Sequence, residues 1–247
     1  MIHYHGTPFS GEIKNTTALV GHHAMVSFAA PDALEICAEI CQSIALDNGA
    51  FSAWTKGADY DPEAAVKWAS HWLAHPAVDW AVIPDKIDGT EEENDALLDL
   101  VEFACPALWV PVWHLHESLD RLERLVDYWP RIAFGSSGEF AQIQTPQWWN
   151  RMTEALDVAT DEEGYPKAKF HGLRMLDPGI FSYVPLSSAD STNVARNMGL
   201  DIRWTGPYVP TSAFARAIVI MDRIERHASA SRWIAHHWQQ QNFDLLG

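Results

Sequence analysis

The sequence is poor in cysteine, in basic residues and in long hydrophobic runs. Its three cysteines, Cys37, Cys41 and Cys105, are too few for a disulfide framework and form no CxxC zinc motif. No apolar run approaches the roughly 20 residues that a membrane-spanning helix needs, and the first residues lack the charged-then-apolar pattern of a signal peptide. We therefore expect a reduced, cytoplasmic protein that makes no use of a membrane.

Negative charge is in excess, and apolar residues are plentiful. Lys and Arg number 17 against 33 Asp and Glu, so the formal charge of −16 argues against a non-specific binder of polyanions. A hydrophobic content of 47 % is enough for a sizeable core. The length of 247 residues fits one large α/β barrel, which typically needs about 250 residues.

Short β-rich runs alternate with helical patterns along most of the chain. The runs are mostly bounded by Gly, Pro, Asn or Asp, as buried strands are. We predict eight strands at 2–5, 24–29, 43–46, 79–83, 108–113, 131–134, 170–175 and 183–186. We predict helices at 31–41, 61–75, 90–103, 118–128 and 146–158, a long loop at 6–23 and barely one helical turn at 177–182.

Eight strands separated by helices predict a (β/α)8 TIM barrel, because parallel strands need crossover connections and eight of them close the sheet. We expect a single domain over 1–247, with the barrel at about 1–192 and extra C-terminal helices at about 193–247. Two of these helices are predicted at 211–227 and 231–241.

Three aspartates lie at or after predicted strands: Asp47 at the third, Asp85 at the fourth and Asp190 near the eighth. The active site of such barrels lies at the carboxyl ends of the strands, so these carboxylates are expected to converge. Each is also a common cap or turn residue, and this ordinary role stays open. Paired carboxylates suit glycosidic-bond chemistry, in which one attacks the sugar carbon and a protonated one assists the leaving group.

Five short motifs resemble those of the guanine transglycosylases. Asp47-Asn48-Gly49-Ala50-Phe51-Ser52 is similar to the Asp-Ser-Gly-Gly-Phe/Tyr-Gln stretch of the tRNA-guanine transglycosylases. The other four are Val82-Ile83-Pro84-Asp85, Gly135-Ser136-Ser137-Gly138-Glu139, Ser188-Ala189-Asp190-Ser191-Thr192 and His5-Gly6-Thr7-Pro8. The last two look closer to the phage and bacterial branch that acts on DNA, the 7-deazaguanine DNA transglycosylases.

This resemblance implies base exchange in DNA. Asp190 would attack C1′ of deoxyguanosine, and Asp47 would be the general acid and then the base for an incoming 7-deazaguanine such as 7-cyano-7-deazaguanine (preQ0). Asp85 would bind the N1–H and amine of the base, and Phe51 would stack on it. Further base-binding residues are expected at Asn48, His114, Gly135, Ser136, Ser137 and Glu139. The implied partners are DNA with a flipped-out guanine, the free base and a protein that aids DNA binding, with no cofactor and no metal.

The sequence departs from the tRNA enzymes in three places. They carry a structural zinc site of three Cys and a His after the nucleophile, whereas no cysteine follows Cys105 here. The zinc subdomain is therefore expected to be absent, which favours a nucleic acid other than tRNA. Ser52 stands where their motif has Gln, and His114 stands where they read the base with Gln.

Two other functions stay open. His3-x-His5 on the first strand, with Lys86, His114 and Asp190 on later strands, is similar to the pattern of metal-dependent amidohydrolases. That pattern also needs a histidine on the sixth strand, where the sequence has Phe134-Gly135-Ser136. The other alternative is a non-catalytic barrel that holds a 7-deazaguanine or a nucleic acid.

Overall fold

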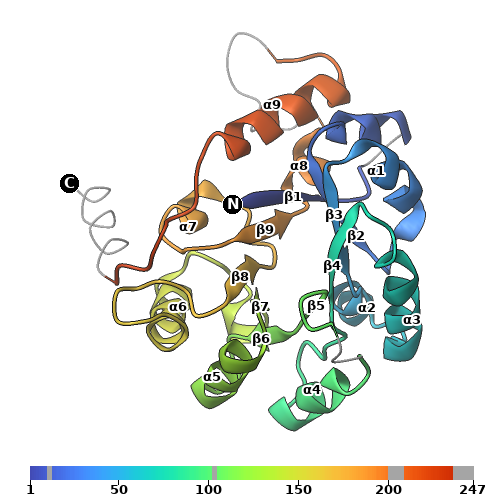
Figure 1. Cartoon of the computed structure of the whole chain (residues 1–247). Helices are drawn as coiled ribbons and strands as arrows, with labels where there is room; N and C mark the ends of the chain where they lie inside the picture. The colour runs from blue at the N-terminus through green and yellow to red at the C-terminus, as the bar shows by residue number, and fades with distance from the viewer. Residues whose placement is uncertain (10–12, 102–104, 200–208, 236–247) are drawn as a thin grey trace, which may run out of the picture.

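The computed structural model describes residues 1–9, 13–101, 105–199 and 209–235. Nine parallel strands form one sheet that curls into a barrel with helices around it (Figure 1). The strands are β1 (Ile2–Gly6), β2 (His23–Ser27), β3 (Ser43–Asp47), β4 (Val78–Val82), β5 (Trp109–Val110), β6 (Val112–His114), β7 (Arg131–Gly135), β8 (Lys169–Gly172) and β9 (Ser188–Ser191). The predicted α/β barrel fold is confirmed.

One proline explains why there are nine strands and not eight. The strand order is β5-β4-β3-β2-β1-β9-β8-β7-β6, so consecutive strands β5 and β6 stand at its two ends. Only Pro111 separates them, and proline has no N–H with which to continue a ladder. Its carbonyl oxygen still accepts a hydrogen bond from the N–H of Ala133 at 2.9 Å. β5 and β6 are therefore two halves of one strand position, and the ring has the eight positions that the sequence predicts.

Alternate residues along each strand face the inside of the barrel. A compact cluster fills the interior, made of Tyr4, Met25, Ala45, Trp80, Val82, Val110, Val112 and Ala133. The intervening residues, such as Val26, Leu46 and Ala81, pack outward in a larger core beneath the helices. This period of two fixes which side chains of a strand reach the mouth.

Helices surround the barrel. The α-helices are α1 (Leu34–Ile40), α2 (Ala50–Lys56), α3 (Pro62–Trp72), α4 (Glu91–Leu98), α5 (Leu119–Tyr128), α6 (Pro146–Ala159), α7 (Pro178–Phe181), α8 (Asn193–Asn197) and α9 (Ala213–Glu225). The five predicted between the strands at 31–41, 61–75, 90–103, 118–128 and 146–158 correspond to α1, α3, α4, α5 and α6. Side chains cap several of them, and Thr90 and Glu93 form a complete capping box on α4. Among the described residues, no helix is long and apolar enough to cross a membrane.

Two predicted segments differ in the structure, and one helix was not predicted. The eighth strand was predicted at 183–186, but β9 lies at Ser188–Ser191 because Ser188 pairs in register with Ile2. Residues Val184 and Leu186 belong to the outer core and not to the sheet, which is why their apolar run resembles a strand. The predicted loop at 6–23 contains a 3-10 helix, η1 (Ile13–Leu19), and α2 was not predicted.

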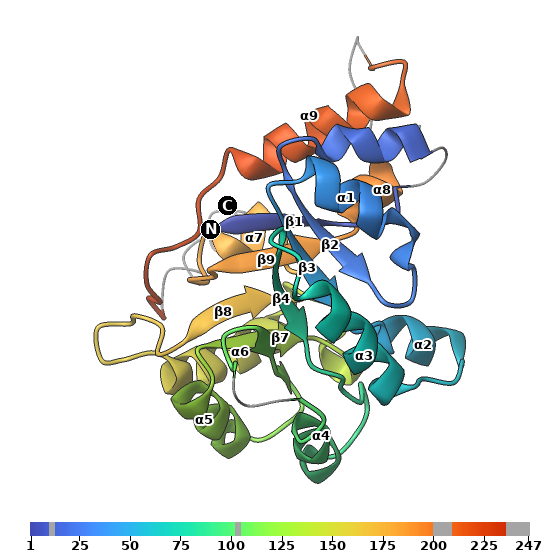
Figure 2. The same ribbon diagram turned by 45° about the vertical axis from the view of Figure 1, so that its right-hand side comes forward.

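The C-terminal part covers one side of the barrel. α9, in orange, lies alongside η1 and near α8, so this late helix packs against an early segment of the chain (Figures 1 and 2). This helix confirms the prediction at 211–227. The helix predicted at 231–241 is not seen in residues 231–235, and its remainder lies outside the described residues.

Candidate functional site

A cavity of about 340 Å³ opens at the carboxyl ends of the strands. Of the predicted site residues, those that line it are Asp47, Asn48, Phe51, Asp85, His114, Gly135, Ser136, Ser137 and Asp190. Met25 and Val82, which belong to the barrel interior, form part of its lining. The cavity therefore sits directly on the interior cluster, in the place where this fold class binds its substrates.

Strand register turns two of the carboxylates into the mouth. Asp190 pairs with the inward-facing Tyr4, and neighbouring positions of a parallel sheet point to the same face. Asp47 lies two residues beyond the inward-facing Ala45, so it also points inward. Both positions follow from the period-two pattern of the strands.

The turn between β3 and α2 depends on Gly49. This residue has φ of +83°, and a Cβ there would lie 2.9 Å from the backbone nitrogen of Ala29. Asp47 Oδ2 accepts the N–H of Gly49 at 3.2 Å, and Asn48 Oδ1 accepts the N–H of Ala50 at 2.8 Å. Glycine is needed for both reasons, and the turn holds Asp47 and Asn48 side by side at the mouth.

Asp85 is held by two neighbours. Its Oδ1 accepts a hydrogen bond from Asn48 Nδ2 at 2.6 Å, and its Oδ2 lies 2.8 Å from His114 Nε2. The Asp85 side chain is only 8 % exposed. A carboxylate has about four lone-pair positions, so each oxygen of Asp85 keeps one for a ligand. Asp85 is thus an oriented acceptor pair at the floor of the cavity.

The position of His114 is in turn fixed by a buried ion pair between Glu117 and Arg121. Its backbone N–H donates to Glu117 Oε2 at 2.8 Å, and the same oxygen pairs with Arg121 at 2.7 Å. Both side chains of this ion pair are 1 % exposed. Gly135 leaves space for the imidazole, since a Cβ at this position would come within 2.8 Å of His114 Nδ1. This packing explains Gly135 without any contact to a ligand.

Asp47 is a carboxylic acid with an unusual affinity for its proton. Its pKa is raised to about 6: burial is the largest cause, a hydrogen bond from Ser27 acts against it, and the negative charges of Asp190 and Asp85 add to it. At neutral pH a measurable fraction of Asp47 is therefore protonated. A raised carboxyl pKa next to other carboxylates is the arrangement that lets one acid donate a proton while another stays ionised.

Asp190 is placed for a different task. Its Oδ1 accepts the backbone N–H of Arg174 at 2.8 Å and lies 3.4 Å from His171 Nε2. Burial lowers the pKa of His171, and the Nδ1 of this ring contacts Ser188 Oγ at 2.9 Å. Within the described part of the chain, the hydrogen bond from Arg174 and the contact with His171 are both to Oδ1, so Oδ2 remains for a reacting atom.

Arg174 is a site residue that the sequence analysis did not single out. Its backbone has φ of +60°, which is uncommon outside glycine and is typical of functional positions. Its guanidinium lies 4.1 Å from the ring centre of Phe51 and donates to the carbonyl of Ser136. The guanidinium therefore covers one face of Phe51, the ring that we expected to stack on a base.

Glu139 does not join the other predicted residues. Its Oε2 accepts a hydrogen bond from Gln147 Nε2 at 2.6 Å, so its side chain is directed to α6 and to a separate surface hollow. Ser136 and Ser137 do face the cavity and are fixed by Trp148 and by the carbonyl of Ile87. The Gly-Glu ending of the loop thus carries no cavity residue in this structure.

The histidines of the first strand face away from the mouth. His5 Nε2 contacts Glu225 of α9 at 2.7 Å, and His3 Nε2 contacts the carbonyl of His227 at 3.3 Å, both outside the barrel. Lys86 is exposed and pairs with Glu93 on α4 at 2.5 Å. The residues of the amidohydrolase pattern are therefore not gathered at one place, because His3 and His5 occupy the outward positions of β1.

Two more basic residues lie at the rim, and neither was among the predicted site residues. Lys56, at the end of α2, and Arg196, on α8, line the cavity together with Arg174. Both residues lie on helices, so a search restricted to strand ends does not find them. The Gly49 turn was the available indication, since it begins the helix that carries Lys56.

No family model matches the sequence, and no curated protein shows significant similarity to it.

Proposed function

We propose that the protein is a guanine transglycosylase that replaces guanine in DNA with a 7-deazaguanine. The observation that carries this proposal is the pairing of Asp190 with Asp47 in one cavity. One carboxylate has an oxygen left for attack, and the other has a pKa raised to about 6. Glycosidic-bond exchange through a covalent intermediate needs one carboxylate as the nucleophile and a second as the general acid and base.

The proposed exchange consists of two successive substitutions at C1′ of the deoxyribose. Asp190 Oδ2 attacks C1′, the bond from C1′ to N9 breaks, and Asp47 gives its proton to the departing guanine. The resulting ester joins the deoxyribose to Asp190. The incoming 7-deazaguanine then loses the proton on its N9 to Asp47 and attacks C1′, which releases Asp190 as a carboxylate.

The two acceptor oxygens of Asp85 favour the binding of a guanine-like ring over that of other bases. Its two oxygens are fixed by Asn48 and His114, so they present one lone pair each to the neighbouring N1–H and exocyclic amine of such a ring. Both 7-deazaguanines and guanine carry these two donors. Adenine and cytosine lack this pair of donors, and selectivity for guanine-like bases follows.

DNA is proposed as the nucleic acid on two grounds. The segments at His5–Pro8 and Ala189–Thr192 resemble the DNA-acting branch, and the zinc-binding cysteines of the tRNA enzymes are absent after Cys105. The cavity is recessed at the mouth, so a base in a duplex has to be flipped out to reach it. The formal charge of −16 opposes contact with a phosphate backbone, which is why a partner protein that aids DNA binding belongs to the proposal.

The test is incorporation of radiolabelled guanine and 7-cyano-7-deazaguanine into DNA and, in parallel, into tRNA. We expect label in DNA, loss of it in Asp190→Asn, and a denaturation-resistant DNA adduct in the wild type that the variant does not form. Label in tRNA alone would correct the nucleic acid and keep the chemistry. Asp88→Asn, an exposed carboxylate outside the cavity lining, is the matched control.

The non-catalytic alternative predicts a different result. A binding module would bind 7-cyano-7-deazaguanine in calorimetry and lose that binding in Asp85→Asn, yet show no exchange and no adduct with DNA or tRNA. Full exchange by Asp190→Asn would contradict the assignment of the nucleophile.

A further inference from the structure

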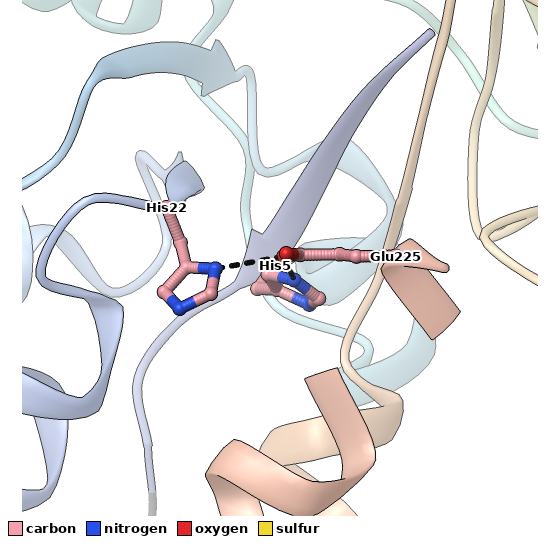
Figure 3. Close-up of side chains that lie close together, drawn as sticks. All are labelled: His5, His22 and Glu225. Carbon is pink, nitrogen blue, oxygen red and sulfur yellow. Dashed lines mark hydrogen bonds and ion pairs between the residues drawn. The ribbon is translucent and has the colours of Figure 1, made fainter. Parts of the chain in front are cut away.

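Two histidines and a glutamate meet outside the barrel, away from the cavity. His5 Nε2 and His22 Nδ1 lie 2.7 and 2.8 Å from the same atom, Glu225 Oε1 (Figure 3). The two rings approach this oxygen from different sides, with their planes 78° apart. One donor atom from each residue lies within 4.8 Å of the others, and this is the one such group that the described residues form.

The burial of His5 is not explained by packing alone. Its side chain is fully buried, and among the described residues its Nδ1 has no hydrogen-bond partner. Burying a polar ring is costly unless its polar atoms are used, and the one hydrogen bond that the described residues give this ring is to Glu225. His22 and Glu225 are 26 % and 28 % exposed, so an ion has a route to the cluster from solvent.

We propose that His5, His22 and Glu225 bind a divalent transition-metal ion of the zinc class. Two imidazole nitrogens and one carboxylate oxygen are a ligand set that Zn²⁺ uses, with water as the fourth ligand. The proposal is independent of the chemistry proposed for the cavity, because none of the three residues lines it.

For an ion to enter, the three ligand atoms, which lie within 4.8 Å of one another, must adopt the spacing of a zinc site. Two ligands of a tetrahedral zinc ion lie about 3.3 Å apart, so the carboxylate has to withdraw by roughly 0.5 Å. Glu225 is partly exposed and can make this movement. Each ring nitrogen that now donates to Oε1 exchanges its hydrogen for the metal, and that hydrogen moves to the other nitrogen of the ring.

The ion would join three separate segments of the chain. His5 is on β1, His22 precedes β2, and Glu225 is the last residue of α9. The C-terminal end of a helix carries partial negative charge, which favours a cation at this position. The proposed role is therefore structural: the ion fastens the end of α9 to the outside of the barrel.

The experiment uses the full chain without a polyhistidine tag, freed of metal by a chelator. Zn²⁺ is titrated against a chromophoric competitor, and Co²⁺ is added separately to record its visible absorption. We expect one ion per chain, the intense bands of tetrahedral Co²⁺, and a rise in Tm with Zn²⁺. His22→Ala and Glu225→Gln should each weaken binding more than about 100-fold, beyond the effect of losing an outer-shell partner.

Two controls separate this site from other histidines. His71→Ala removes an exposed histidine on α3, and the double variant His236→Ala/His237→Ala removes a pair near the C-terminus. Both should bind Zn²⁺ as the wild type does. Circular dichroism verifies that His22→Ala and Glu225→Gln are folded. The Co²⁺ spectrum of the wild type tests the site even if a variant does not fold.

Three results would overturn the proposal. The first is no binding of Zn²⁺ or Co²⁺ at micromolar concentration by the wild type. The second is binding that survives in both His22→Ala and Glu225→Gln. The third is binding that is lost in His236→Ala/His237→Ala, which would place the ion elsewhere.

Discussion

Asp47, Asp85 and Asp190 are chemically identical side chains in three different surroundings. Asp85 is occupied on both oxygens by Asn48 and His114, which orients it as an acceptor. Asp190 receives its hydrogen bonds on one oxygen only among the described residues, while Asp47 is desolvated beside two negative charges. In the proposed reaction, these surroundings give Asp85 the role of binding the base, Asp190 that of the nucleophile and Asp47 that of the proton donor and acceptor.

The raised pKa of Asp47 predicts a site that lowers the stability of the fold. A carboxyl group whose pKa is higher in the folded state than in the unfolded state contributes stability at low pH, and this contribution is lost as the pH rises through about 6. Asp47→Asn cannot ionise. We expect the variant to be more stable than the wild type at pH 7.5 by about 1–3 kcal/mol.

Urea unfolding at pH 7.5 and pH 4.5 measures this difference. The gain from Asp47→Asn should shrink at the lower pH, where the folded wild type keeps its proton. Asp88→Asn, at an exposed position, should change stability by less than about 0.5 kcal/mol at either pH. An equal gain at both pH values would show that ionisation of Asp47 is not its cause.

Single residues are also where sequence reasoning reached its limit. Asp47, Asp85 and Asp190 could be found because strand ends carry the site in this fold. Arg174 could not, since its place over Phe51 depends on a positive φ that the sequence does not reveal. Glu139 was placed in the site by its motif, yet a hydrogen bond to Gln147 directs it to α6.

Among the elements, the connection from β6 to α5 positions His114 through a buried ion pair. Glu117 accepts from Asn94, Arg121 and the backbone N–H of His114. Glu117→Ala would leave the Arg121 charge and two other donors without this partner. Because Arg121 keeps its ion pair with Asp95 at 2.7 Å, we expect a loss of about 1–3 kcal/mol, the cost of leaving buried donors unsatisfied.

Thermal or urea unfolding of Glu117→Ala tests this expectation. Glu123→Ala, on the exposed face of the same helix, is the control and should cost less than about 0.5 kcal/mol. A loss as small as that of the control would mean that the polar groups around Glu117 find other partners. The role given to this segment in holding His114 would then be wrong.

Elements with a clear local sequence pattern could be predicted, whereas a strand whose position is set by its pairing with another strand could not. The first six strands lie within about two residues of their predicted positions, because short apolar, β-rich runs bounded by turn residues mark them in the sequence. β9 could not be located in this way, since its place depends on register with β1 and its sequence Ser188–Ser191 is short and polar. The apolar run just before it is buried by helix packing instead.

At the scale of the whole molecule, the charge of −16 opposes the approach of a phosphate backbone. The cavity differs from this average. Its lining combines three aspartates with three basic residues, Lys56, Arg174 and Arg196, and Asp47 is partly protonated near neutral pH. The cavity lining therefore lacks the excess of acidic over basic residues that the whole molecule has, and the proposed function places the nucleic acid there.

This charge distribution predicts how DNA binding responds to salt. Arg196 is exposed at the rim, so a phosphate contact there releases counterions when DNA binds. Arg196→Ala should weaken binding of a single-stranded oligonucleotide and reduce the slope of log K against log salt by about 1. Fluorescence anisotropy between about 50 and 200 mM salt measures both effects.

The matched control is Arg226→Ala, which removes an exposed arginine just beyond α9 that does not line the cavity. It changes the net charge by the same amount, so a general effect of charge would alter both variants equally. A change of slope in Arg196→Ala alone would place the phosphate contact at the mouth. Equal slopes in both variants and the wild type would mean that Arg196 makes no phosphate contact, and that the DNA backbone is held by another surface or by a partner protein.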